Sequence, residues 1–154
     1  GYLGDPQREC TCTDGEIRRY GQKISGPLLD RIDLHVSVMR PKYSELTATI
    51  QGEPSCDIAK RVAEARAVQA ERLSRWHMQS NAQMGHRQLK ETCQLDAEGA
   101  EMLRVVFEKL HLSARSYDRI IKVARTIADL AGSDQIRPEH VAEAISFRNM
   151  INGK

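Results

Sequence analysis

The sequence has 154 residues, of which 40% are hydrophobic, 29% charged and 5% aromatic. This length suits one domain, or a small domain with a fragment of a second, so a large multidomain enzyme is excluded, and the chain is too apolar to be disordered. Lysine and arginine number 23 against 21 aspartates and glutamates, and a net charge of +2 excludes binding to nucleic acid through overall charge alone.

Apolar runs in this sequence are short. None approaches the ~18 residues that a membrane-spanning helix needs. The first residues, Gly1 to Asp5, form neither a basic leader nor an apolar signal segment. We therefore expect a cytoplasmic location.

The first fifty residues predict loops, two short helices and one strand. Asp14 is placed to cap a helix that runs towards Ile24, and the run 25–29 begins with Ser-Gly-Pro, which opens a second helical turn. Residues 32–38 alternate apolar and polar side chains, which is the pattern of a half-buried strand. Because a lone strand leaves its backbone unpaired, we expect this strand to belong to the sheet of something larger.

Beyond an expected linker at 41–54, every segment predicts helix. Helical periodicity is found at about 55–76, at about 87–93, after the caps Asp96 and Ser113, and from Pro138 onwards. Gly132 is expected to end the helix that Ser113 begins. The expected fold is mainly α, a small helical bundle preceded by a loop and one strand.

The four cysteines are Cys10, Cys12, Cys56 and Cys93. An even number could form disulfides in a secreted protein, but the charged composition and the helical context of Cys56 and Cys93 favour reduced thiols. Cys10 and Cys12 are one residue apart in a loop and can face one metal ion. Since tetrahedral zinc takes four ligands, the pair makes half of a site.

Arg115 is the most informative single residue. It follows the expected cap Ser113 by two positions and lies in the first helical turn, where the helix dipole disfavours a cation. Free backbone N–H groups and a guanidinium at one helix start together form an anion site suited to phosphate. The structural alternative is an exposed arginine paired with Asp118 or a neighbouring carboxylate.

Arg31 lies at the entrance to the expected strand. A residue at such a junction is held rigidly and can present its charge to a neighbouring subunit. The alternative is a local ion pair with Asp30 or Asp33.

Four blocks of the sequence, taken together, resemble one known family. They are the segment 1–6 (GYLGDP), the pair Cys10 and Cys12, the segment 24–34 (ISGPLLDRIDL) and the segment 112–130 (LSARSYDRIIKVARTIADL). In this order and spacing they are similar to the C-terminal part of magnesium chelatase-like AAA+ ATPases of the competence protein ComM type. The resemblance covers nearly the whole chain.

The resemblance implies a division of the chain and two site residues. Residues 1–40 would be the end of an αβα nucleotide-binding core, 41–54 a linker and 55–154 the helical lid. Arg31 would be the arginine finger that reaches the nucleotide of the next subunit in a ring. Arg115 would be the sensor 2 residue, which touches the nucleotide phosphate from the lid.

The resemblance also implies ATP and magnesium as cofactors of a longer parent protein, with DNA and identical subunits as partners. Such proteins resemble DNA motors that drive branch migration. The present sequence has no GxxxxGK[ST] loop, so we expect no tightly bound cofactor and no ATP hydrolysis from this chain alone. Cys10 and Cys12 would be half of a four-cysteine cluster.

A competing interpretation is a free-standing nucleic-acid-binding bundle that places a helix such as 113–131 in a groove of DNA. Such a module has no use for the strand expected at 32–38. A zinc-stabilised scaffold lacks sufficient ligands.

Overall fold

The computed structural model describes residues 1–47 and 52–148. Contacts divide the chain into two units, the first comprising Gly1–Ile32 with Val36–Ile50 and the second Asp33–His35 with Gln51–Lys154. The expected linker 41–54 and the expected lid 55–154 include residues 48–51 and 149–154, which lie outside the described part. Within that part, no helix is both long and apolar enough to cross a membrane.

The described residues of the first unit form three short helices, α1 (Asp14–Gly21), α2 (Gly26–Leu29) and α3 (Tyr43–Thr47). Thr13, not Asp14 as expected, caps α1 in a capping box with Glu16: the Thr13 Oγ1 accepts from the Glu16 N–H at 3.3 Å, and Glu16 accepts from the Thr13 N–H at 2.9 Å. The helix α3 falls inside the expected linker.

The strand expected at 32–38 does not form. The described residues contain no strand, and this segment is irregular, with Val36 64% and Val38 88% exposed. Alternation of apolar and polar side chains is not sufficient to form a strand, because a strand exists only when a neighbouring strand pairs with its backbone. The main-α expectation is nevertheless confirmed, since the ordered elements are helices.

The second unit is the helical bundle. Its elements are α4 (Ser55–Arg72), the 3₁₀ turns η1 (Ser74–Trp76) and η2 (Asn81–Gln83), α5 (His86–Thr92), α6 (Ala97–Lys109), α7 (Ala114–Leu130) and α8 (Pro138–Ser146). Asp96 caps α6 by accepting from the Gly99 N–H at 2.7 Å. Gly132, at φ 65°, lies just beyond α7 in the left-handed region that favours glycine.

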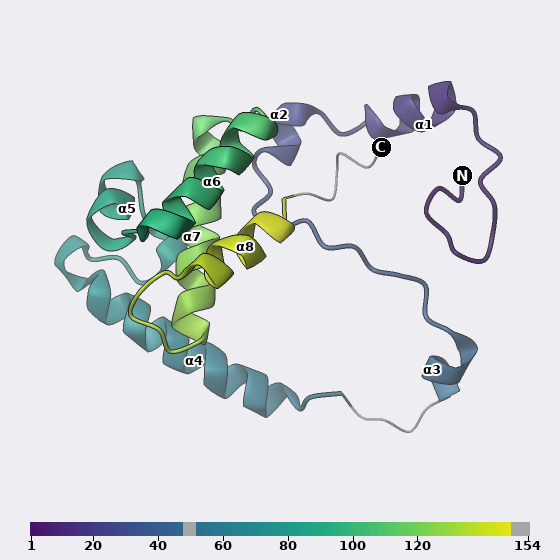
Figure 1. Ribbon diagram of the computed structural model, residues 1–154. Helices are drawn as coiled ribbons and strands as arrows, with labels where there is room; N and C mark the ends of the chain where they lie inside the picture. The colour runs from purple at the N-terminus through teal and green to yellow at the C-terminus, as the bar shows by residue number, and fades with distance from the viewer. Residues whose placement is uncertain (48–51, 149–154) are drawn as a thin grey trace. The chain divides into compact units, whose positions relative to one another are not determined.

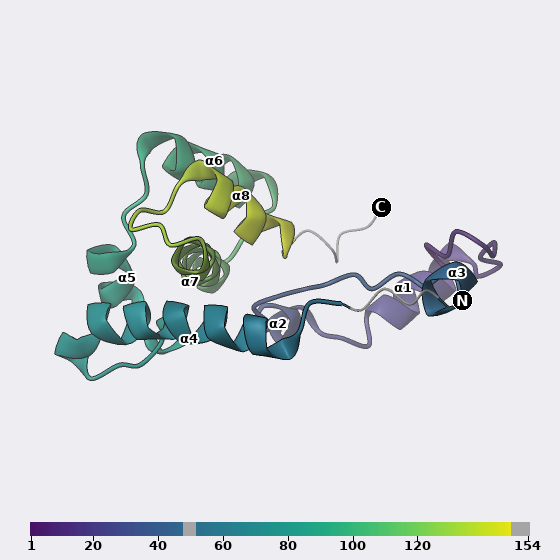
Figure 2. The ribbon, with the colours of Figure 1, turned by 90° about the horizontal axis from the view of Figure 1, so that it is seen from below.

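Helix α7 is the centre of this bundle. It packs against α4, α5, η2 and α8, and α6 packs against α8. Figure 1 shows the elements in chain order, and Figure 2, which looks almost along α7, shows α4 on one side of it and α6 with α8 on the other.

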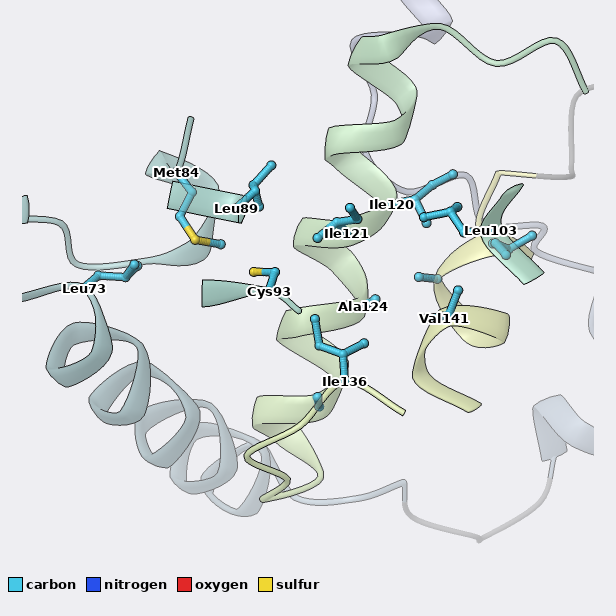
Figure 3. Close-up of a cluster of buried hydrophobic side chains, with 13 residues drawn as sticks. Leu73, Met84, Leu89, Cys93, Leu103, Ile120, Ile121, Ala124, Ile136 and Val141 are labelled. Atoms are coloured by element: carbon cyan, nitrogen blue, oxygen red, sulfur yellow. The ribbon is translucent and has the colours of Figure 1, made fainter. Parts of the chain in front are cut away.

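The hydrophobic core surrounds α7 on two sides. Ile120 and Ile121 are 1% and 5% exposed. In Figure 3, Ile120 points from α7 towards Leu103, and Ile121 points to the other side, towards Cys93. Consecutive residues of α7 thus pack against helices on two sides of it, which explains why apolar residues cover a large part of its circumference.

Candidate functional site

Arg115 lies in the first turn of α7. Ser113 caps this helix, because its Oγ accepts a hydrogen bond from the N–H of Ser116 at 3.1 Å. Arg115 is exposed, and its side chain makes no hydrogen bond or ion pair within the part of the chain that the structure describes. Asp118, the alternative partner, instead lies with its Oδ1 2.9 Å from the Nδ1 of His86. The guanidinium is therefore available to an anion.

Arg115 borders a groove of about 660 Å³ that runs along α7. Arg119 and Lys122 line the same groove, and residues at positions i, i+4 and i+7 share one face of a helix, so the three cations form a row. The apolar part of the lining is made by Leu34, Ala82, Met84, Val123, Ile127, Leu130 and Phe147. A basic row beside apolar side chains can bind an anionic ligand that also has an apolar part.

Carboxylates balance the charge of this groove. Asp33 forms an ion pair with Arg119, although the two residues are far apart in the sequence. Asp118 and Glu143 line the groove as well. The groove is therefore mixed in charge rather than uniformly basic. Within the described residues, Arg119 pairs with a carboxylate, Lys122 donates to the backbone carbonyl of Ala82, and Arg115 has no carboxylate partner.

A buried cluster of charged and polar side chains lies beside the groove and joins α4, η2 and α7. The carboxylate of Asp129 accepts hydrogen bonds from Arg72 at 2.8 and 2.7 Å, from Arg125 Nε at 3.0 Å and from Asn81 Nδ2 at 2.8 Å. Burial raises the pKa of Asp129. The hydrogen bonds from Arg72 and Asn81 and the charges of both arginines outweigh burial, so the pKa lies below its ordinary value.

Sequence reasoning missed this cluster. One signal was present, namely that Arg125 and Asp129 are four residues apart and lie next to Ala124 and Ala128, which are buried in the core. A charged pair at helical spacing beside core positions indicates a buried ion pair. The contribution of Arg72 could not be read from the sequence, because it depends on how α4 packs against α7.

Arg31 belongs to the first unit and lies just after α2. Its backbone N–H donates to the carbonyl of Leu28 at 3.0 Å, which holds the chain in a turn, and Arg31 is exposed. Asp33, one of the two acids considered as a local partner, belongs to the second unit and pairs with Arg119. Arg31 and Arg115 therefore lie in different units.

The thiols of Cys10 and Cys12 converge on the backbone of Gly1. A Cβ placed on Gly1 would lie 2.7 Å from the Cys12 sulfur and 3.3 Å from the Cys10 sulfur. Hydrogen bonds from the backbone N–H groups of Cys12 and Tyr2 lower the pKa of the Cys10 thiol, which favours the thiolate that metals bind.

The donor set for zinc is nevertheless incomplete. Within residues 1–47 and 52–148, no group of three or more His, Cys, Asp or Glu side chains could hold a metal ion. Two thiolates do not fill a tetrahedral site, so the described residues do not fit a complete zinc centre.

Comparison with known proteins gives matches over both units. Residues 52–148 match the family model described as magnesium chelatase, subunit ChlI C-terminal, and residues 1–46 match that of magnesium chelatase, subunit ChlI. The competence protein ComM of Haemophilus influenzae is 39% identical over 137 residues, which cover 88% of this chain and 26% of that protein. The protein YifB of Escherichia coli is 37% identical over 148 residues, which cover 96% of this chain and 28% of that protein.

The chain thus spans about a quarter of the length of these relatives. The C-terminal family model covers most of the chain, including every helix of the bundle. The chain belongs to the magnesium chelatase ChlI family, and its resemblance to the magnesium chelatase-like proteins of the ComM type is confirmed.

Proposed function

We propose that this chain is the C-terminal part of a ring-forming AAA+ ATPase, and that its helical bundle is the lid over the nucleotide. The observation that carries this proposal is the position of Arg115. An arginine in the first turn of α7, without a carboxylate partner among the described residues and at the edge of a groove, is placed to meet a phosphate. In this role Arg115 acts as sensor 2.

Arg31 is the proposed arginine finger of the same protein. It would act on the nucleotide of the neighbouring subunit in the ring, where a cation stabilises the charge that develops during phosphoryl transfer. Its exposure and its position in a turn after α2 support this role. Residues 1–40 would then belong to the nucleotide-binding core, 41–54 to a linker and 55–154 to the lid.

The remaining parts of the proposed activity concern the longer protein. ATP and magnesium would be held chiefly by residues outside this chain, because the sequence has no phosphate loop. Likeness to a competence protein supports DNA as the substrate and remodelling of DNA, such as branch migration, as the work done. Family membership favours this motor over a free-standing nucleic-acid-binding module. The cytoplasmic location stays a prediction.

The test is Arg115→Ala in the longer protein and in this chain. We expect ATP binding or hydrolysis by the longer protein to fall about ten- to a hundredfold, because one charged hydrogen-bonding group is lost. The melting temperature of this chain should stay the same or rise slightly, since a cation at a helix start is removed.

Arg137→Ala is a matched control. Arg137 also lies at a helix start, as the residue preceding α8, and it is exposed, with Glu139 3.9 Å away. This variant should leave the ATPase of the longer protein unchanged. If Arg115→Ala instead destabilises the chain and leaves the ATPase normal, Arg115 is a structural arginine and the sensor 2 role is wrong.

A further inference from the structure

Three residues of the second unit, Asp33–His35, bind along the groove, and we refer to them as the strap. Asp33 pairs with Arg119, Leu34 lines the groove, and the N–H of His35 donates to the carbonyl of Phe147 at 2.9 Å. Phe147 is itself part of the lining. The strap therefore places a carboxylate inside the groove that Arg115 borders.

Arg119 is suited to the same kind of ligand as Arg115. The two lie one helical turn apart on one face of α7 and line one groove. A guanidinium binds carboxylate and phosphate oxygens with the same donor geometry. The carboxylate of Asp33 thus occupies, at Arg119, a position that a phosphate oxygen could take.

The contacts of the strap favour its exchange for another ligand. The Asp33 side chain is 57% exposed, so water and salt reach the ion pair and screen it. Both ring nitrogens of His35 are buried and lack a hydrogen-bond partner among the described residues. Buried polar groups without partners disfavour the state that buries them. Release of the strap would rehydrate this imidazole.

We propose that Arg119 is a second anion-binding residue of this groove, and that Asp33 is an internal competitor which a polyphosphate displaces. The inference rests on the proposed role of Arg115, since both arginines would hold one ligand. A polyphosphate carries several negative charges and can bridge both guanidinium groups, whereas Asp33 offers one charge to one of them. Nucleotide binding and release of the strap would then be coupled.

The test uses the 154-residue chain and inorganic tripolyphosphate, with affinity measured by titration calorimetry at low salt. Asp33→Asn should tighten binding by about two- to fivefold, the range that loss of a competing exposed ion pair allows. Arg119→Gln should weaken binding by about tenfold, and in that background Asp33→Asn should have no further effect. An equal gain from Asp33→Asn with and without Arg119 would overturn the proposal.

Glu143→Gln is the matched control for charge. It removes one negative charge from the same groove and leaves the ion pair between Asp33 and Arg119 in place. Any gain in affinity from this variant should persist when Arg119 is replaced. If Glu143→Gln and Asp33→Asn change the affinity for tripolyphosphate equally, both with and without Arg119, net charge explains the effect. Asp33 is then not a competitor for Arg119.

Amide hydrogen exchange gives an independent readout. Saturating tripolyphosphate should speed exchange at the His35 N–H, because release of the strap breaks its bond to Phe147. Unchanged exchange at His35, or no binding of millimolar tripolyphosphate, would overturn the inference.

Arg115→Gln separates this inference from the proposed function. If Arg115→Gln abolishes tripolyphosphate binding while Asp33→Asn and Arg119→Gln match the wild type, the inference is wrong and the role of Arg115 stands. If the Asp33 and Arg119 variants behave as expected while Arg115→Gln binds normally, the role proposed for Arg115 is wrong.

Discussion

Replacing Asp129 with asparagine removes the negative charge at the centre of the buried cluster and keeps the shape of the side chain. Asp129 is 0% exposed, Arg125 2% and Arg72 20%, measured on their side chains. Neither arginine recovers full hydration when the carboxylate is lost. Removing one partner of a buried ion pair costs about 3–5 kcal/mol, and because Arg72 still reaches water we expect about 3 kcal/mol.

This loss is a large share of the stability of a small domain. Domains unfold with about 5–15 kcal/mol. In a domain of 60–100 residues each kcal/mol shifts the melting temperature by about 4–8 °C, so Asp129→Asn should lower it by about 12–24 °C. Far-UV circular dichroism during heating measures this shift. Glu101→Gln is the control, since Glu101 pairs with Arg104 at 2.6 Å on the exposed surface and its loss should leave the melting temperature almost unchanged.

The loss of stability caused by Asp129→Asn should become smaller as the pH falls. In the folded state the pKa of Asp129 lies below its ordinary value of 3.8, because its hydrogen bonds and charge partners outweigh burial. A group with a lowered folded-state pKa stabilises the fold above its unfolded pKa and loses that contribution as the pH falls through the folded-state value. The difference in melting temperature between wild type and Asp129→Asn should be complete near neutral pH and shrink below about pH 4.

Two results would refute the reasoning about Asp129. One is a loss of stability near neutral pH no larger than that of Glu101→Gln, which would mean that the cluster is effectively solvated. The other is a difference between variant and wild type that stays constant down to strongly acidic pH, since protonation of Asp129 should make the wild type behave like the variant.

Three further predictions concern the core and the proposed activity. Leu103→Ala should lower the free energy of unfolding by urea by about 2–5 kcal/mol, because the Leu103 side chain of α6 is 1% exposed within the core. A smaller loss would mean that the core collapses around the cavity. The purified chain should show no ATP hydrolysis above background in a phosphate-release assay, because it lacks a phosphate loop. Any reproducible turnover would contradict this prediction. In the longer protein, Arg31→Ala should lower the rate of ATP hydrolysis by about 10³-fold and leave nucleotide affinity nearly intact. Mixing this variant with a subunit whose phosphate loop is inactive should restore part of the hydrolysis. If mixing restores none, Arg31 forms a local ion pair instead.

Local signals predicted the helices of the second unit well. Asp96, Ser113 and Gly132 each mark a helix end that the structure has, because a cap or a left-handed glycine acts within one turn of the chain. The strand at 32–38 failed for the opposite reason. Its formation depends on backbone partners from other segments, and alternation of side chains contains no information about whether those partners are present.

In the candidate site, too, local features could be predicted from the sequence and contacts between distant segments could not. Arg115 could be identified from the sequence because its position relative to the cap at Ser113 is local. The pairing of Arg119 with Asp33 and of Arg72 with Asp129 joins residues 86 and 57 positions apart, so only packing of the bundle brings them together. Sequence reasoning therefore located the helix start proposed to bind an anion, and it missed the charges that surround it.

The buried cluster and the groove share a wall, which links the stability of the bundle to its proposed site. Asn81 donates to Asp129 at 2.8 Å and to the hydroxyl of Thr126 at 3.0 Å, and Thr126 lines the groove. The next residue of η2, Ala82, also lines the groove, and its carbonyl accepts a hydrogen bond from Lys122 Nζ at 3.2 Å. Asp129 thus holds η2 against α7 from the buried side, and the width of the groove depends on that contact. The buried charge of Asp129 therefore holds η2 against the helix that carries Arg115, Arg119 and Lys122. Such support would preorganise the proposed anion site.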